Sequence, residues 1–147
     1  MLLLLFACRA PVSVVAQPAA LKQEIESLHR AMVAGFRQDP ATVARFYTDD
    51  ASIIGGGGRS VGREEVARYW ASSPKGAEWT LEVLEVGGDL QTPWVRGRST
   101  LTGQGGRRFV ADYVGILKRG ADGQLRFYID MYVGTPGAVM RVPGGAP

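Results

Sequence analysis

The chain has 147 residues, which suffices for one domain with a hydrophobic core but not for two comfortable domains. Apolar residues make up 46% and charged residues 21%, so we do not expect the middle of the chain to be intrinsically disordered. The net charge is only +3, and no run of Lys and Arg interleaved with aromatic residues occurs, so nothing indicates nucleic-acid binding.

Residues 1–16 form an apolar segment that ends in a small-residue cleavage site after Ala16. This pattern predicts a signal peptide, and hence a secreted or periplasmic protein, although Arg9 interrupts the run and no basic residue precedes it. The segment is too short to span a bilayer. Cys8 follows "LFA", which leaves lipid attachment as the alternative. Because Cys8 is the only cysteine, the processed chain would have no disulfide and no thiolate metal site.

Three helices are predicted in the first half of the chain. Apolar residues recur every three or four positions from Leu21 to Phe36, which is typical of an amphipathic helix. Asp39 followed by Pro40 is an N-cap with proline at the first helical position, so a second, short helix is expected over 40–50. Residues 51–54 read as a brief strand, and "GREEVARYWASS" predicts a third helix with acids near its start.

The second half of the chain predicts a sheet. Four stretches are rich in β-branched and aromatic residues, and turn sequences separate them: 78–86, 93–102, 107–119 and 124–133. Three short connections in succession indicate an antiparallel meander. We therefore expect an α+β domain over 18–133, in which the helices cover one face of a curved antiparallel sheet. The Gly- and Pro-rich segment 134–147 is expected to be a flexible tail.

The order of these elements resembles the nuclear transport factor 2-like superfamily. The resemblance is carried by "FYTDDASIIGGGGRSVGREEVARYW" and "DGQLRFYIDMYV", and it is strongest to SnoaL-like and ketosteroid-isomerase-like domains, including domain of unknown function 4440. It implies a cone-shaped sheet wrapped around three helices, with a pocket at one end and a homodimer formed through the outer sheet face. The superfamily includes isomerases, cyclases, dehydratases, hydrolases and non-catalytic modules, so the fold does not settle the function.

The four glycines at 55–58 raise the question of a phosphate-binding loop. A P-loop would need Lys and Ser or Thr where the chain has Arg63 and Glu64, and a dinucleotide fingerprint would need glycine where it has Ser60 or Val61. In ketosteroid isomerases the resemblance places the general base at Gly55 and the oxyanion-hole tyrosine near Ala31. Neither residue can do that chemistry, so true ketosteroid isomerase activity is not expected and the glycines are interpreted as a turn or pocket rim.

Asp130 is the first candidate catalytic residue. Strand alternation places Tyr128, Asp130 and Tyr132 on one face, and a carboxylate among aromatic rings has a raised pKa, which suits a general acid or base. The alternative is a structural hydrogen bond to a helix end or a tyrosine hydroxyl. The resemblance makes Asp112 the second candidate, near the oxyanion-hole aspartate of the isomerases. The alternative places it on the outer face, paired with Arg96, Arg98 or Arg108 of the same sheet.

Other aromatic and polar residues carry weaker expectations. Tyr47, Tyr69 and Trp70 are expected to line the pocket, with a plain core role as the alternative. Trp79, Trp94 and Phe109 are assigned to sheet packing or a dimer face, and Asp49 and Asp50 to capping. His29 is assigned to the surface of the helix or to its boundary with the core. With a single histidine, no metal site and no Ser-His-Asp triad are expected.

The sequence thus leaves two functions open. The first is a domain that binds a small apolar or carbonyl-containing ligand, with or without isomerase, cyclase or dehydratase chemistry that uses no cofactor. In its catalytic form Asp130 moves the proton while Asp112 or a tyrosine holds the oxyanion. The second is a non-catalytic dimerisation or accessory module of the same fold.

Overall fold

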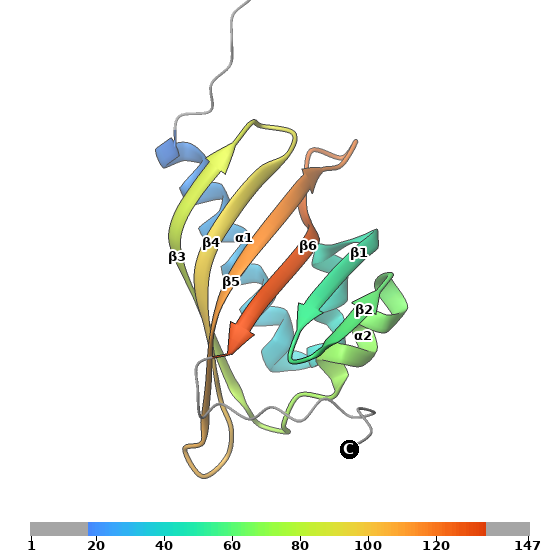
Figure 1. Ribbon diagram of the computed structural model, residues 1–147, viewed down its shortest axis with the longest axis vertical. Helices are drawn as coiled ribbons and strands as arrows, with labels where there is room; N and C mark the ends of the chain where they lie inside the picture. The colour runs from blue at the N-terminus through green and yellow to red at the C-terminus, as the bar shows by residue number, and fades with distance from the viewer. Residues whose placement is uncertain (1–17, 135–147) are drawn as a thin grey trace, which may run out of the picture.

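The computed structural model describes residues 18–134, which have the expected α+β fold (Figure 1). The sheet has six strands, one more than predicted, because residues 58–61 also form a strand. The elements in chain order are α1 (Pro18–Gln38), the 3₁₀ helix η1 (Pro40–Phe46), β1 (Tyr47–Gly55), β2 (Gly58–Val61), α2 (Arg63–Ala71), β3 (Glu78–Gly88), β4 (Pro93–Thr102), β5 (Arg108–Arg119) and β6 (Leu125–Gly134). The predicted signal peptide and the tail beyond residue 134 lie outside the described residues. Within residues 18–134, no helix is both long and apolar enough to cross a membrane.

The sheet has the strand order β2-β1-β6-β5-β4-β3. Strands β3 to β6 form the predicted antiparallel meander. β1, however, runs parallel to β6, so the sheet is mixed and not wholly antiparallel. Figure 1 shows the long helix α1 lying across one face of this curved sheet, where its apolar stripe enters the core.

The second helix is shorter than predicted. The Asp39 side chain caps it as expected, accepting a hydrogen bond of 3.0 Å from the backbone N–H of Ala41. The helix ends at Phe46, and Tyr47, which was expected to be helical, is the first residue of β1 and lies opposite Phe127 of β6. Because no glycine or proline marks this end, only the pairing with a strand about 80 residues away determines where the helix stops.

The tetraglycine segment is the turn of the β1–β2 hairpin. Gly55 and Gly58 are paired across the strands, and Gly56 and Gly57 between them have φ angles of 59° and 81°. A two-residue hairpin turn with both φ angles positive favours glycine at both positions. The interpretation of this segment as a turn is therefore confirmed.

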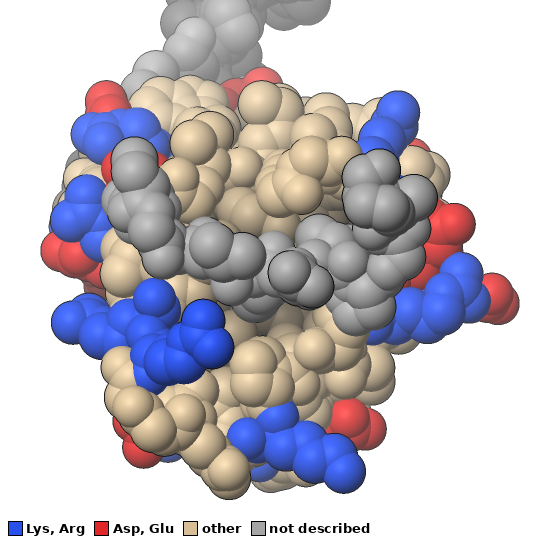
Figure 2. All heavy atoms as spheres, turned by 60° about the horizontal axis from the view of Figure 1, so that its bottom comes forward, with Lys and Arg blue, Asp and Glu red and all other residues tan. Residues whose placement is uncertain are grey.

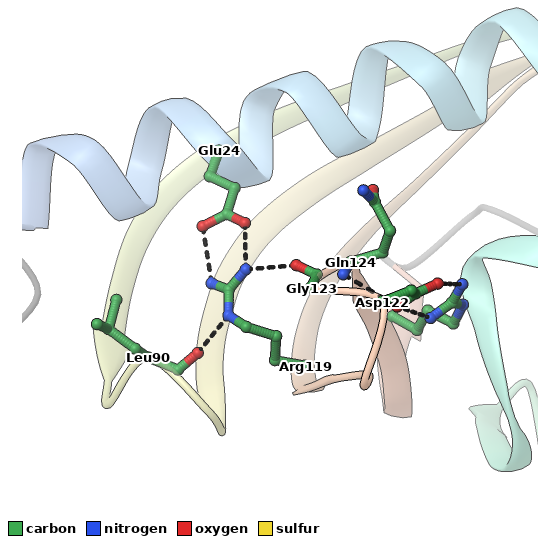
Figure 3. A network of polar contacts seen from close by, with 7 residues as sticks. Glu24, Leu90, Arg119, Asp122, Gly123 and Gln124 are labelled. Carbon is green, nitrogen blue, oxygen red and sulfur yellow. Dashed lines mark hydrogen bonds and ion pairs between the residues drawn. The ribbon is translucent and has the colours of Figure 1, made fainter.

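The end of the molecule that carries the β3–β4 and β5–β6 turns is held by Arg119 (Figure 3). Its guanidinium donates to both carboxylate oxygens of Glu24 on α1, at 2.7 and 2.9 Å. It also donates to the carbonyl oxygens of Leu90 and Gly123, each at 2.8 Å. One side chain thus joins α1 to two turns, and it lowers the pKa of Glu24 through their hydrogen bond.

Candidate functional site

A cavity of about 50 Å³ lies between the helices and the concave face of the sheet, at the end of the molecule opposite Arg119. Five of the residues singled out from the sequence line it: Tyr47, Tyr69, Trp70, Asp130 and Tyr132. They come from β1, α2 and β6, so three segments far apart in the chain build one site. Figure 2 shows this end of the molecule, where charged side chains lie mainly around the margin of an uncharged surface.

Asp130 is the acidic residue of the cavity wall. Its Oδ2 accepts a hydrogen bond of 2.7 Å from the hydroxyl of Tyr47, which is completely buried. Burial raises the pKa of Asp130 to about 6, and the Tyr47 hydrogen bond opposes part of that rise. Near neutral pH the carboxyl group can therefore both take up and release a proton, as a general base or acid requires.

Aromatic rings form most of the remaining wall. Trp70 and Trp79 pack with their ring centroids 4.5 Å apart. The ring of Tyr132 packs against those of Tyr69 and Phe109, with centroids 6.3 and 6.1 Å away. Trp79 and Phe109 were assigned to sheet packing, yet both line the cavity. Their inward direction follows from strand parity, because Trp79 shares its face with Leu81, and Phe109 shares its face with Ala111 and Tyr113.

Two buried polar atoms of the lining residues, the Nε1 of Trp70 and the hydroxyl oxygen of Tyr132, make no hydrogen bond of ordinary geometry within the described part of the chain. Each nevertheless lies near a tyrosine hydroxyl, since Trp70 interacts with Tyr47 and Tyr132 interacts with Tyr69. A buried polar group without a partner destabilises a fold by about 1–3 kcal/mol. Such groups in the wall of a cavity are those that a bound molecule can satisfy.

Gly55, the residue at the isomerase base position, serves the packing of this site. A Cβ atom at Gly55 would lie 2.4 Å from the nearest atom of the Tyr132 ring, closer than any side chain tolerates. The absence of a side chain at position 55 thus lets the Tyr132 ring lie against the backbone of β1. The space that would hold a base is filled by this tyrosine.

Tyr128 does not join the site, and its prediction is wrong. Ile129 pairs with Ile116 but Phe127 pairs with Leu117, so Tyr128 lies in a bulge and strand alternation is broken there. As a result Phe127, not Tyr128, lines the cavity together with Asp130. The ring of Tyr128 instead lies beneath the Nζ of Lys118, 3.2 Å from its centroid.

Asp112 is also not in the site. It is exposed on the opposite face from its neighbours Ala111 and Tyr113, which line the cavity, and it accepts a hydrogen bond of 2.9 Å from Nε of Arg98. The alternative placement beside Arg98 is confirmed. The error has a simple cause, since a shift of one residue in register moves a side chain to the other face of a strand.

His29 was expected on the helix surface but is buried, with only 3% of its surface exposed. Its Nε2 lies 3.3 Å from the hydroxyl of Tyr113, and its ring stacks on Phe127. Burial lowers the pKa of His29 to about 4, so the ring is neutral at pH 7. The sequence did hold a signal, because His29 stands four residues after Ile25 and three before Met32 on the apolar stripe.

Within residues 18–134, no three His, Cys, Asp or Glu side chains lie close enough together to hold a metal ion. The outer face of β5 and β6 exposes four apolar side chains: Val114, Ile116, Met131 and Val133. Exposed apolar side chains grouped in this way are typical of contact surfaces; the homodimer stays a prediction.

Comparisons with known proteins agree with this architecture. The SnoaL-like domain family matches residues 25–128, and no curated protein matches the chain. A ketosteroid isomerase-like protein of Erwinia carotovora atroseptica is 23% identical with a TM-score of 0.64, covering 78% of this chain and 96% of that one. A Catenulispora acidiphila protein in complex with S-DNPA is 18% identical with a TM-score of 0.65, covering 79% and 94%. An NTF2-like protein with a cystatin-like fold from Novosphingobium aromaticivorans is 17% identical with a TM-score of 0.64, covering 79% and 82%.

Proposed function

This chain belongs to the SnoaL-like domain family, and on that premise we propose that its cavity binds a small, largely apolar molecule through a single oxygen atom. The observation that carries the proposal is the set of polar groups in an otherwise aromatic wall. Asp130 offers a carboxyl group with a pKa of about 6, while Trp70 Nε1 and the Tyr132 hydroxyl make no hydrogen bond of ordinary geometry within the described residues. A mostly apolar cavity with a few convergent polar groups is typical of ligand sites.

The size of the cavity limits the ligand. A volume of about 50 Å³ has room for a few water-sized groups, so a compact molecule such as a short ketone or a five-membered ring fits this conformation best. Larger ligands would need the rings of Tyr69 and Tyr132, which are only partly buried, to move aside. The complex of the Catenulispora acidiphila protein supports the proposal only in that a related fold holds a small molecule.

The chemistry we propose is proton transfer next to a carbonyl group, without a cofactor. The Asp130 carboxylate takes a proton from the carbon beside the carbonyl, the C–H electron pair forms the C=C bond of the enolate, and the C=O π pair moves to the oxygen. Trp70 Nε1 and the Tyr132 hydroxyl donate hydrogen bonds to the resulting enolate oxygen. In an isomerisation Asp130 then returns the proton to the same or another carbon. In a dehydration the enolate instead expels a hydroxyl group from the next carbon, and Asp130 gives that leaving group its proton.

Deuterium exchange into cyclopentanone tests this proposal. We expect the protein to accelerate exchange of the protons beside the carbonyl in D₂O, with a rate that rises with pH around the Asp130 pKa of about 6. Asp130→Asn should lower the protein-dependent rate by about 100-fold or more. Asp112→Asn is the matched control, since it removes a carboxylate of the outer face, and it should leave the rate unchanged. Full activity of Asp130→Asn would refute the catalytic role.

A second candidate function is a non-catalytic dimerisation or accessory module, and the exposed apolar side chains of β5 and β6 favour it. Light scattering should then give twice the mass of one chain, and Ile116→Glu with Met131→Glu should halve it. A dimer whose cavity accelerates no exchange and binds no small ketone would favour this second function over the first.

A further inference from the structure

The two carboxylate oxygens of Asp130 have different surroundings. Oδ2 accepts the hydrogen bond of 2.7 Å from the Tyr47 hydroxyl, whereas Oδ1 accepts no hydrogen bond from any residue that the structure describes. Asp130 lines the cavity and keeps part of its surface exposed. Oδ1 is therefore the oxygen atom left for a ligand.

The Tyr47 side chain is held in place by two further elements. It is completely buried, and its ring packs against that of Phe127 with the centroids 5.5 Å apart. Tyr47 and Phe127 are also opposite each other in the pairing of β1 with β6, the strand that carries Asp130. The backbone carbonyl oxygen of Tyr47 accepts a hydrogen bond of 3.2 Å from Arg63 at the start of α2. A closely packed ring fixed in this way leaves its hydroxyl group little freedom to move away from Oδ2.

The Tyr47 hydroxyl is the donor in this contact. Burial raises the pKa of Tyr47 well above its ordinary value and the nearby Asp130 charge adds to that rise, so the hydroxyl keeps its proton while Asp130 titrates. An ionised carboxylate can only accept hydrogen bonds, so the proton of Tyr47 lies toward Oδ2. This bond favours the ionised form and lowers the pKa of Asp130, against the larger and opposite effect of burial.

No other described group in the cavity wall takes over this task. Tyr69 on α2 and Tyr113 on β5 also face the Asp130 charge, but burial raises the pKa of both hydroxyl groups, so they stay neutral. Tyr132 on β6 lines the cavity as well, without a hydrogen bond to Asp130. The lining residues from α1, β3 and β4 carry no charge, and the described wall contains no Lys, Arg or His. Within residues 18–134, Tyr47 therefore makes the single side-chain hydrogen bond to the Asp130 carboxylate.

We propose that Tyr47 is a positioning residue for the proton transfer described above: its hydroxyl group holds Oδ2 and so directs Oδ1 of Asp130 toward the ligand. This inference rests on the proposed function and adds to it the atom that reacts. The proton removed from the carbon beside the carbonyl group becomes bound to Oδ1 and leaves again from Oδ1, while Tyr47 keeps its own proton throughout. The same bond helps to keep the carboxyl group ionised near neutral pH, where it acts as the base.

A titration of Asp130 in the full chain without ligand tests the contact. We expect the carboxyl-carbon NMR signal of Asp130 to have its midpoint near pH 6 in wild type and at least about one pH unit higher in Tyr47→Phe, because the bond that favours the ionised form is lost. Tyr128→Phe is the matched control, since it removes a tyrosine hydroxyl outside the cavity lining, and its midpoint should equal that of wild type. An equal midpoint in wild type and folded Tyr47→Phe would overturn the proposal.

Replacement of Tyr47 by 3-fluorotyrosine repeats the test with the contact kept, in case the loss of the buried hydroxyl unfolds the chain. The fluorinated hydroxyl group is the stronger donor, so Asp130 should titrate at a lower pH than in wild type. A midpoint equal to that of wild type, or above it, would contradict a bond from Tyr47 that controls Asp130.

Exchange kinetics test the positioning role itself. In the cyclopentanone assay, the midpoint of the rate against pH should rise in Tyr47→Phe by the same amount as the NMR midpoint. At pH 8.5, where Asp130 is ionised in both proteins, we expect the variant to be at least about threefold slower. A more basic carboxylate would by itself react faster, so a slower rate reports lost positioning, and a rate equal to or above that of wild type would refute it. If wild type accelerates no exchange, the proposed function fails and the positioning role with it, whereas an active wild type with an unchanged variant removes the positioning role alone.

Discussion

At the end of β5, all three guanidinium nitrogens of Arg119 donate to an oxygen atom, whereas in the cavity lined by Asp130 the Nε1 of Trp70 and the Tyr132 hydroxyl make no hydrogen bond of ordinary geometry. Each place holds an ionisable side chain against the sheet. The Arg119 end satisfies its charge within the fold, and the Asp130 end leaves part of its polar surface to be satisfied from outside. The first arrangement is that of a structural contact, and the second is that of a site.

The two groups also differ in what the fold does to their charge. Arg119 and Glu24 stabilise each other as ions, since their hydrogen bond raises the pKa of Arg119 and lowers that of Glu24. Burial instead works against the ionised form of Asp130 and raises its pKa. Removing the charge of Arg119 should therefore destabilise the fold, and removing that of Asp130 should stabilise it. Both effects can be measured as changes in the free energy of unfolding.

Arg119→Leu should have the largest effect on stability. It removes four hydrogen bonds that join α1 to two turns, and at about 1 kcal/mol for each bond we expect the free energy of unfolding to fall by about 4 kcal/mol. Urea denaturation at pH 7.5 measures it. The matched control is Arg96→Leu, which breaks a single exposed pair with Glu85 and should cost under about 1 kcal/mol. Equal losses from the two variants would show that the Arg119 network adds nothing beyond an ordinary surface pair.

Asp130→Asn should raise stability at pH 7.5 by about 3 kcal/mol, because the pKa is shifted by about two units and each unit is worth about 1.4 kcal/mol. The folded-state pKa of about 6 exceeds the unfolded value near 3.8, so the folded state holds the proton more tightly. The ionised group therefore destabilises the fold increasingly as pH rises from about 4 to 6, and the cost is constant above that range. Asparagine can still accept the Tyr47 hydrogen bond, so the variant keeps the contact while losing the charge.

Urea denaturation of wild type and Asp130→Asn at several pH values checks this sign. The gain in stability should shrink as pH falls and vanish near pH 3.5, where Asp130 is protonated in both folded and unfolded states. Asp112→Asn serves as the control because it alters an exposed carboxylate. A loss of stability in Asp130→Asn at pH 7.5 would mean that Asp130 is a structural ion, like Glu24.

Local patterns in the sequence were sufficient for much of the fold but for less of the site. The cap at Asp39, the glycine turn and the meander follow from neighbouring residues. The start of β1 at Tyr47 and its parallel pairing with β6 depend on contacts between distant segments, so local patterns did not show them. The place of Asp130 among aromatic residues could be seen in the sequence, whereas its hydrogen bond to Tyr47 spans 83 residues.

The errors at the site share one physical origin. Strand alternation indicates a face only while the ladder is regular, and the bulge at Tyr128 reverses it. Asp112 was placed by resemblance alone, which does not determine the register, and a shift of a single residue changes the face. His29 was judged by its polarity, although its spacing from Ile25 and Met32 put it on the buried stripe of α1.

His29 sharpens the comparison of charged groups, because its expected pH dependence is opposite to that of Asp130. Its folded-state pKa of about 4 lies below the unfolded value of 6.5, so the unfolded chain binds more protons and stability falls as pH drops from about 6.5 to 4. Between pH 7.5 and 5.5 we expect this group to lower stability by about 1 kcal/mol. Over part of this range it opposes the contribution of Asp130, so wild type should change little.

His29→Gln should reveal how stability depends on pH through Asp130, because the opposing contribution of His29 is removed. Glutamine can accept the Tyr113 hydroxyl and carries no titrating group, so the variant should become more stable relative to its own value at pH 7.5 as the pH falls to 5.5. Three charged residues line the hollow between α1 and β3 together with His29: Glu26 and Arg30 on α1 and Glu82 on β3. They are exposed or only partly buried, and the variant leaves them unchanged. A pH profile of His29→Gln that parallels wild type would mean that His29 does not titrate differently on folding, and that Asp130 alone distinguishes the cavity end.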